Sequence, residues 1–164
     1  MNLANNTCRN RPDVAFRQKT ATEDEIRKHL QSCDFLFNPP LHNRVQIPAY
    51  SQKIAERATT FEAWSGEALV GLVAAYYNDQ TSRRGFITSV SVLSDFQRYG
   101  VGGALIQRAL DYGVAAGFKT VALEASVTNT TVIAFYQKHG FYVLRTDGGI
   151  VTLERDFSPF SDVV

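Results

Sequence analysis

A glycine-rich run at residues 97–104 is the part of this chain whose residue types point most clearly to chemistry. It contains Gly100, Gly102 and Gly103, and it joins a strand-like segment to a helix-like one. Glycine has no Cβ, so a phosphate group can approach the backbone closely at these positions. The first amides of a helix, together with the helix dipole, favour an anion. The run therefore predicts a binding site for a phosphate-bearing cofactor.

The spacing of the glycines narrows the choice of cofactor. A dinucleotide fingerprint needs a third glycine where this chain has Leu105, and the Gly-Lys-Ser/Thr of a nucleotide P-loop is absent from the sequence. The pattern that fits is Q/R-x-x-G-x-G/A, from Gln97 through Gly100 to Gly102. It resembles the pyrophosphate-binding turn of the GNAT superfamily of acyl-CoA-dependent N-acetyltransferases. The alternative is a tight turn that only seats a helix.

A second block strengthens this resemblance. Residues 129–141 are similar to the family pattern N-x-x-A-x-x-F/L-Y-x-K-x-G-F, with Val132 in the usual alanine place. The two blocks stand in the family's order, with one predicted helix and one predicted strand between them. The chain departs from the pattern at Ser94, where the family often has proline, and at Arg98 and Tyr99, where Gly-Lys or Gly-Arg is common. Phosphate binding through main-chain amides tolerates these departures.

The resemblance implies that acetyl-CoA is the co-substrate. In this family the pantetheine arm pairs with the strand before the turn as an added strand would, and the amides of the turn hold the pyrophosphate. Asn129 is also expected to cap the helix that follows it. The predicted cofactor-binding residues are Val90, Val92, Gln97, Arg98, Tyr99, Gly100, Val101, Gly102, Gly103, Ala104 and Asn129.

The implied reaction moves an acetyl group to a primary amine by direct attack through a tetrahedral intermediate. An alkyl ammonium with a pKa of about 10.4 is almost fully protonated at pH 7, so the site must take up a proton. Tyr136 stands where the family's tyrosine donates to the sulfur of coenzyme A, and it is the predicted acid. Glu124 is the candidate base, and a main-chain amide at or near Val92 is the expected oxyanion donor. The alternatives are a packed aromatic ring for Tyr136 and a solvent-facing strand residue for Glu124.

The segment between the first two predicted helices is expected to border the acceptor. It is aromatic and has one basic residue, so it suits a sugar ring or a small apolar amine better than a polycation. Phe35, Phe37 and Asn38 are the predicted substrate-binding residues, and the predicted partner is a small-molecule amine. The alternative for the aromatic side chains is packing of the loop onto the sheet. A second interpretation of the whole chain is a catalytically silent acyl-CoA-binding sensor or interaction module.

The amino-acid composition further limits the class of protein. The chain has 164 residues, of which 45% are apolar and 20% charged, with a net charge of +1. This balance is typical of a soluble globular protein and gives no sign of nucleic-acid or membrane binding. Cys8 and Cys33 form no metal-ligand cluster, and both are expected to be free thiols in a reducing, cytoplasmic compartment. A homodimer through a C-terminal hairpin is left open.

The predicted fold class is α/β (α+β), a single-domain GNAT fold. The expected order of elements is β-α-α-β-β-β-α-β-α-β-β, with a mixed, mostly antiparallel sheet of about seven strands and about four flanking helices. Residues 1–12 are expected to be a flexible lead-in, and residues 13–164 the acetyltransferase domain. Thr22 and Glu25 form a capping-box pattern. The helix that they open should bury Ile26, Leu30 and Cys33.

Overall fold

The computed structural model describes residues 12–157, in which seven strands form one sheet of order β1-β2-β3-β4-β5-β7-β6. The strands are β1 (Ala15–Gln18), β2 (Thr59–Ser65), β3 (Ala68–Tyr76), β4 (Arg84–Val92), β5 (Thr120–Ser126), β6 (Tyr142–Asp147) and β7 (Ile150–Asp156). The α-helices are α1 (Glu23–Cys33), α2 (Ile47–Arg57), α3 (Val101–Ala115) and α4 (Thr130–Lys138), with 3-10 turns η1 (Asp34–Leu36), η2 (Leu41–Asn43) and η3 (Ser94–Phe96). The predicted fold class and order of elements are confirmed.

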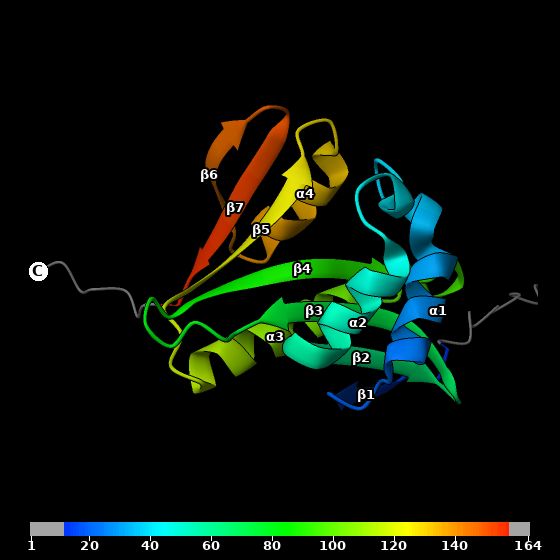
Figure 1. The fold of residues 1–164 in the computed structure, drawn as a ribbon. Coiled ribbons are helices and arrows are strands. Elements are labelled where there is room, and N and C mark those ends of the chain that lie inside the picture. Colours follow the sequence, from blue (N-terminus) through cyan, green and yellow to red (C-terminus); the bar gives the residue numbers. More distant parts are fainter. Residues whose placement is uncertain (1–11, 158–164) are drawn as a thin grey trace, which may run out of the picture.

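The sheet divides at its single parallel pair of strands. All other neighbours in it are antiparallel, whereas β4 and β5 run parallel and pair only from Arg84 to Phe86 with Thr120 to Ala122. Beyond that point the two strands diverge, and β5 with β7 and β6 rises away from β4 in Figure 1. The second half of β4 therefore has a sheet partner on one edge only.

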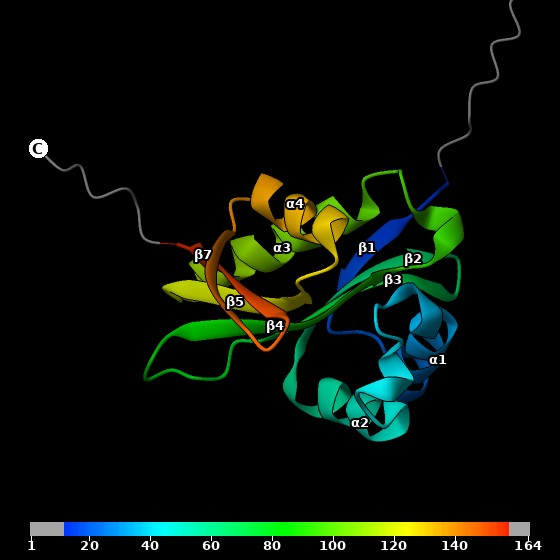
Figure 2. The same ribbon diagram turned by 90° about the horizontal axis from the view of Figure 1, so that it is seen from above.

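Helices cover both faces of this divided sheet. Figure 2 shows α1 and α2 on one face and α3 and α4 on the other. Each face has its own apolar core, and the predicted inward side of α1 is confirmed, since Ile26, Leu30 and Cys33 are fully buried. The capping box is also confirmed, because the Thr22 side chain accepts from the Glu25 amide and the Glu25 side chain accepts from the Thr22 amide.

A bulge in β4 decides which of its side chains face which core. Ala74 of β3 pairs with Ser89, but Ala75 pairs with Ile87, so Thr88 is an extra residue in β4. After the bulge the polar Ser89 and Ser91 are buried on the face of α1 and α2. Val90 and Val92, which alternate with them, pack against the core below α3 and α4.

Several predictions concern the ends of the chain and its surroundings. The lead-in assigned to residues 1–12 lies, apart from Pro12, outside the described residues, as does Cys8, whereas Cys33 is a buried free thiol. Among residues 12–157 no helix has the length and apolar character needed to cross a bilayer. In the same range no group of three or more His, Cys, Asp or Glu side chains is placed to hold a metal ion. The cytoplasmic location and the homodimer stay predictions.

Candidate functional site

The divergence of β4 and β5 opens a cleft of about 590 Å³ that reaches both faces of the sheet. On the face of α3 and α4, its wall comes from the glycine turn and from α4. On the face of α1 and α2, it comes from the segment between those two helices. The predicted site residues in the wall are Phe37, Asn38, Val90, Val92, Gln97, Arg98, Gly100, Val101, Gly102, Gly103, Glu124, Asn129 and Tyr136. Phe35, Tyr99 and Ala104 do not line it.

The glycine turn places free amides at the start of α3. Gly100 is the N-cap residue in a left-handed conformation, with φ of 77°, and no side chain caps the helix. The Ala104 amide donates to the Gly100 carbonyl at 3.0 Å, so this predicted member of the cradle is already engaged. The amides of Val101, Gly102 and Gly103 belong to the first turn, which has no intrahelical acceptor for them. Together with the helix dipole they suit a phosphate.

Helix α3 begins at Val101, within the glycine-rich run at residues 97–104. Glycine disfavours a helix interior because it loses more backbone freedom there than other residues do. In the structure Gly102 and Gly103 occupy the first turn instead. A Cβ at Gly102 would lie 3.7 Å from both Phe135 and Val92, which shows how closely the turn sits between α4 and the end of β4.

The open edge of β4 presents main-chain groups to the cleft. The Leu93 amide donates to the Val70 carbonyl of β3 at 2.8 Å. Since successive residues of a strand direct their main-chain groups to opposite edges, those of Val90 and Val92 point away from β3. The Val92 carbonyl there accepts a hydrogen bond from Gln97 Nε2 at 3.0 Å, which ties the turn to the strand. The edge can therefore pair with an extended ligand.

Tyr136 lies where the cleft meets the core. It is 7% exposed and packs against the rings of Phe135 and Phe141, at centroid distances of 5.4 and 5.8 Å. Burial raises the pKa of its phenol, so the hydroxyl keeps its proton throughout the neutral range. That hydroxyl bonds to no other residue of the described chain. It is thus a protonated donor available to a group in the cleft.

Asn129 and Glu124 line the same cleft as Tyr136. The predicted cap is confirmed: Asn129 is the N-cap residue of α4, and its side-chain oxygen accepts from the Val132 amide. Glu124 is an exposed residue of β5 opposite Thr152 of β7. Within residues 12–157 it has neither an ion pair nor a side-chain hydrogen bond. Its carboxylate can therefore receive a proton or an ammonium group.

The segment between α1 and α2 forms the opposite wall. Phe37 and Asn38 line the cleft, as predicted for residues near the acceptor, together with Leu36 and Arg44. The Arg44 guanidinium lies over the Phe37 ring, 5.8 Å from its centroid. Phe35 instead is 81% exposed, because η1 turns it outward. Its role in acceptor binding is not supported by this position and stays a prediction.

The sequence did not predict the contacts of two polar side chains that pack behind β4, His29 and Tyr50. His29 is buried, and its Nδ1 lies 2.9 Å from the Leu69 carbonyl, which can only accept, so Nδ1 carries the hydrogen. Its Nε2 then accepts from the Ser91 hydroxyl at 2.8 Å. Tyr50 donates to the Thr88 carbonyl at 2.7 Å. No pattern in the sequence signals these contacts, since they join residues far apart in the chain.

Solved structures share the fold of this chain. A putative acetyltransferase of the GNAT family from Desulfovibrio desulfuricans matches with a TM-score of 0.72 and 16% identity, over 89% of this chain and 100% of that one. An N-acetyltransferase from Thermoplasma acidophilum, solved in complex with coenzyme A, matches with a TM-score of 0.70 and 13% identity, over 88% of this chain and 99% of that one. At these low sequence identities, the structural similarity shows that the fold is shared.

Similar sequences are named as N-acetyltransferases. A probable N-acetyltransferase of Drosophila melanogaster is 28% identical over 86 residues, which are 51% of this chain and 47% of that protein. N-alpha-acetyltransferase 50 of Danio rerio is 26% identical over 121 residues, which are 64% of this chain and 72% of that protein. The match thus spans about half the length of the first relative.

The family itself is defined by a longer match. The family model described as "Acetyltransferase (GNAT) family" matches residues 24–141, which include both sequence blocks and most of the cleft wall. This chain belongs to the acetyltransferase (GNAT) family. The predicted family and the acyltransferase class are confirmed, and acetyl-CoA is the co-substrate that fits the free amides of the turn and the open edge of β4.

Proposed function

We propose that this chain transfers an acetyl group from acetyl-CoA to the primary amine of a small molecule by direct attack. The observation that carries the proposal is the end of the β4–β5 pairing at Phe86 and Ala122. This opening places an unpaired strand edge, the amides at the start of α3 and the Tyr136 hydroxyl along one cleft. These are the three kinds of group that an acyl-CoA and its transfer chemistry need.

Main-chain groups would hold the co-substrate. The amides of Val101, Gly102 and Gly103 would bind the pyrophosphate, and the open edge at Val90 and Val92 would pair with the pantetheine arm. Bound in this way, the co-substrate supplies an activated acetyl thioester. A main-chain amide of this edge, at or near Val92, would donate to the acyl oxygen as negative charge develops there.

Two side chains would move the protons. Glu124 would accept the proton of the acceptor ammonium, directly or through water, because its carboxylate has no partner in the described chain. Tyr136 would donate its proton to the departing sulfur. Burial, which raises the pKa of this phenol, ensures that the proton is present when the sulfur leaves. A covalent enzyme intermediate is not required.

The acceptor would enter from the face of α1 and α2. The wall there is aromatic and nearly uncharged apart from Arg44, and this favours a small acceptor over a polycation. A polypeptide N-terminus is a second candidate acceptor, because one relative of this chain is named N-alpha-acetyltransferase 50. Both acceptor classes present a primary amine to the same Glu124.

The test is release of the coenzyme A thiol from acetyl-CoA, followed with a panel of amino sugars, amino acids, polyamines and peptides. Tyr136→Phe removes the hydroxyl and keeps the ring, so we expect turnover to fall by about 10- to 1000-fold while acetyl-CoA affinity changes little. Tyr142→Phe is the matched control, because Tyr142 is an exposed residue of β6 whose hydroxyl bonds to Glu154. Unchanged turnover of the Tyr136 variant would exclude it as the acid.

The same measurements separate an enzyme from a sensor. Tight binding of acetyl-CoA with no thiol release from any acceptor would favour the catalytically silent acyl-CoA-binding module. Release with peptides alone would replace the small-molecule acceptor by a polypeptide N-terminus. Glu124→Gln should lower turnover in the neutral range, where the acceptor amine is protonated and needs a base, and the difference from the wild type should shrink as the pH rises toward the pKa of the amine.

A further inference from the structure

We infer that the acceptor carries a carboxylate in addition to its amine, and that Arg44 binds this carboxylate. The inference rests on the proposed acetyl transfer and names the chemical class of the acceptor. It follows from the charges on the cleft wall, in which Arg44 and Glu124 face the cleft from opposite sides and neither has an ionic partner in the described chain.

Arg44 is held in place by its own segment. It follows η2, and its amide donates to the Leu41 carbonyl at 2.9 Å. Asp34 fastens this turn to the end of α1, because one carboxylate oxygen accepts from the His42 amide at 2.8 Å and the other lies 2.6 Å from His42 Nδ1. The backbone that carries Arg44 is therefore fixed even though its side chain is exposed.

The Arg44 guanidinium lies at the acceptor end of the cleft. It stacks on Phe37, and its charge acts on the hydroxyl of Tyr50, which donates to the Thr88 carbonyl of β4. Burial raises the pKa of Tyr50, and Arg44 partly opposes this effect. The guanidinium thus lies near Tyr50, whose hydroxyl reaches the bulge of β4 at Thr88.

The two arginines of the cleft wall lie in different places and suit different anionic groups. Its charged wall residues within the described range are Arg44, Arg98 and Glu124. Arg98 belongs to the turn, where the phosphates of the co-substrate would lie. Arg44 comes from the other face and has no such anion to bind. A guanidinium binds a carboxylate through two parallel hydrogen bonds, which makes it selective for this group.

Glu124 of β5 is the remaining charged residue of the described cleft wall. It is the only acidic residue among the described residues of the wall. An acceptor with one ammonium and one carboxylate can satisfy both walls at once, whereas a diamine would meet Arg44 with a like charge. A free α-amino acid offers this pair of groups, and so does a peptide with an acidic residue at or near its N-terminus.

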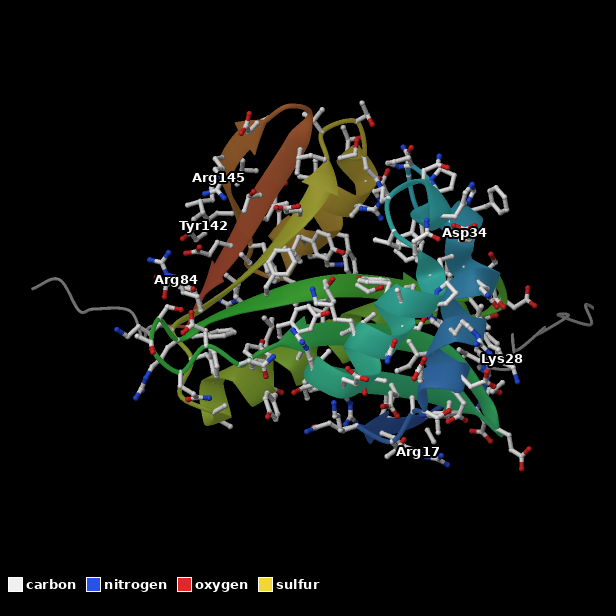
Figure 3. The ribbon with its side chains drawn as sticks, in the orientation of Figure 1. Arg17, Lys28, Asp34, Arg84, Tyr142 and Arg145 are labelled. Atoms are coloured by element: carbon white, nitrogen blue, oxygen red, sulfur yellow. The ribbon has the colours of Figure 1, made fainter. Side chains whose placement is uncertain are left out.

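Another hollow in the described chain supports no such inference. It lies between Arg84, Arg145 and Glu154, near the β6–β7 hairpin. Figure 3 shows Arg84 and Arg145 far from Asp34, at the other end of the molecule. No element of the proposed transfer chemistry reaches this hollow.

The experiment compares acceptors that differ in one charge. Free amino acids are tested against their amides, and peptides beginning with Asp or Glu against those beginning with Asn or Gln. We expect the wild-type protein to prefer the carboxylate member of a pair by about 10- to 100-fold in kcat/KM, the range of a hydrogen bond to a charged group. A preference confined to amino acids or to peptides identifies the source of the carboxylate.

Variants of Arg44 test whether this residue causes the preference for a carboxylate acceptor. Arg44→Gln should remove it mainly through a higher KM for the carboxylate acceptor, with the KM for acetyl-CoA unchanged. Arg44→Glu should invert it in favour of the neutral or cationic acceptor. Arg145→Gln, which changes an exposed arginine of β6, is the control and should leave it intact. An equal response of both acceptors to the Arg44 variants would overturn the inference.

A binding measurement distinguishes failure of this inference from failure of the proposed function. If no acceptor releases thiol, calorimetric titration of amino acids into the protein saturated with coenzyme A still reports on Arg44. Binding of the acid but not of its amide, lost in Arg44→Gln, would support the carboxylate site even without turnover. Thiol release without any preference for a carboxylate would refute the inference and leave acetyl transfer standing.

Discussion

His29 should make the stability of this protein fall as the pH drops below neutrality. The imidazole is 3% exposed, donates from Nδ1 to Leu69 of β3 and accepts at Nε2 from Ser91 of β4. Burial lowers its pKa from 6.5 to about 4. A proton on Nε2 would also reverse the bond with Ser91, because the imidazolium can only donate and the hydroxyl would have to accept. The folded protein therefore needs this ring neutral.

The size of the effect follows from the two pKa values. In the unfolded chain His29 takes up its proton near pH 6.5, before the folded protein does at about pH 4. The unfolded state thus binds more protons in this window, and stability is lost as the pH falls through it. Each pH unit in the window is worth about 1.4 kcal/mol, so we expect about 2 kcal/mol to be lost between pH 7 and pH 5 and about 3 kcal/mol in total.

Urea unfolding at pH 7 and pH 5 measures this loss. His29→Gln cannot ionise, so its free energy of unfolding should change less between the two pH values than that of the wild type, by about 2 kcal/mol. His42→Gln is the control, because His42 is half exposed and paired with Asp34. If His29→Gln loses as much stability as the wild type over this range, the ring is not the buried neutral group described above.

Two further predictions concern the cofactor turn and the interior. Gly100→Ala places a Cβ in open space at a φ of 77°, so it should cost about 1 kcal/mol of stability and weaken acetyl-CoA binding at least tenfold; Gly66→Ala, at a φ of 58° in another turn, should cost the same without affecting binding. Equal affinities for the two variants would show that the cofactor does not approach Gly100. Glu62 is fully buried, and its carboxylate accepts from Thr20, Ala21, Thr60 and Trp64. Burial alone would raise the pKa of Glu62, but these hydrogen bonds lower it, so Glu62→Gln should destabilise the protein by about 2–3 kcal/mol at pH 7, and by less as acid protonates the wild-type carboxylate. A difference in urea midpoint that does not shrink toward low pH would contradict this account.

Local sequence determined the elements and the glycine turn. The capping box at Thr22, the cap at Asn129 and the αL glycine at Gly100 act over a few residues, so their effect can be read from short patterns. Apolar periodicity likewise located the buried side of α1. The two family blocks supplied the order of the elements and the nature of the co-substrate, because those properties depend on short segments whose spacing is fixed.

Sequence patterns were less informative about the wall that faces the acceptor. Phe35 and Phe37 are the same residue type two positions apart, yet η1 exposes the first and directs the second into the cleft. In the sequence, Arg44 is simply one basic residue of a loop. Only the folded structure shows that it lines the cleft. No periodicity distinguishes such residues, because their surroundings come from other parts of the chain.

Only the tertiary structure decided how these parts form a site. The bulge at Thr88 sends Ser91 toward His29 and keeps Val90 on the opposite face, although the alternation of residue types alone does not reveal the extra residue. The divergence of β4 from β5 after Phe86 depends on strands that are more than thirty residues apart. The sequence by itself determined that a glycine turn at the start of α3 and a tyrosine-bearing helix exist. Long-range strand pairing and packing determined that they open onto the same cleft, because such contacts are fixed by the whole chain and not by its local patterns.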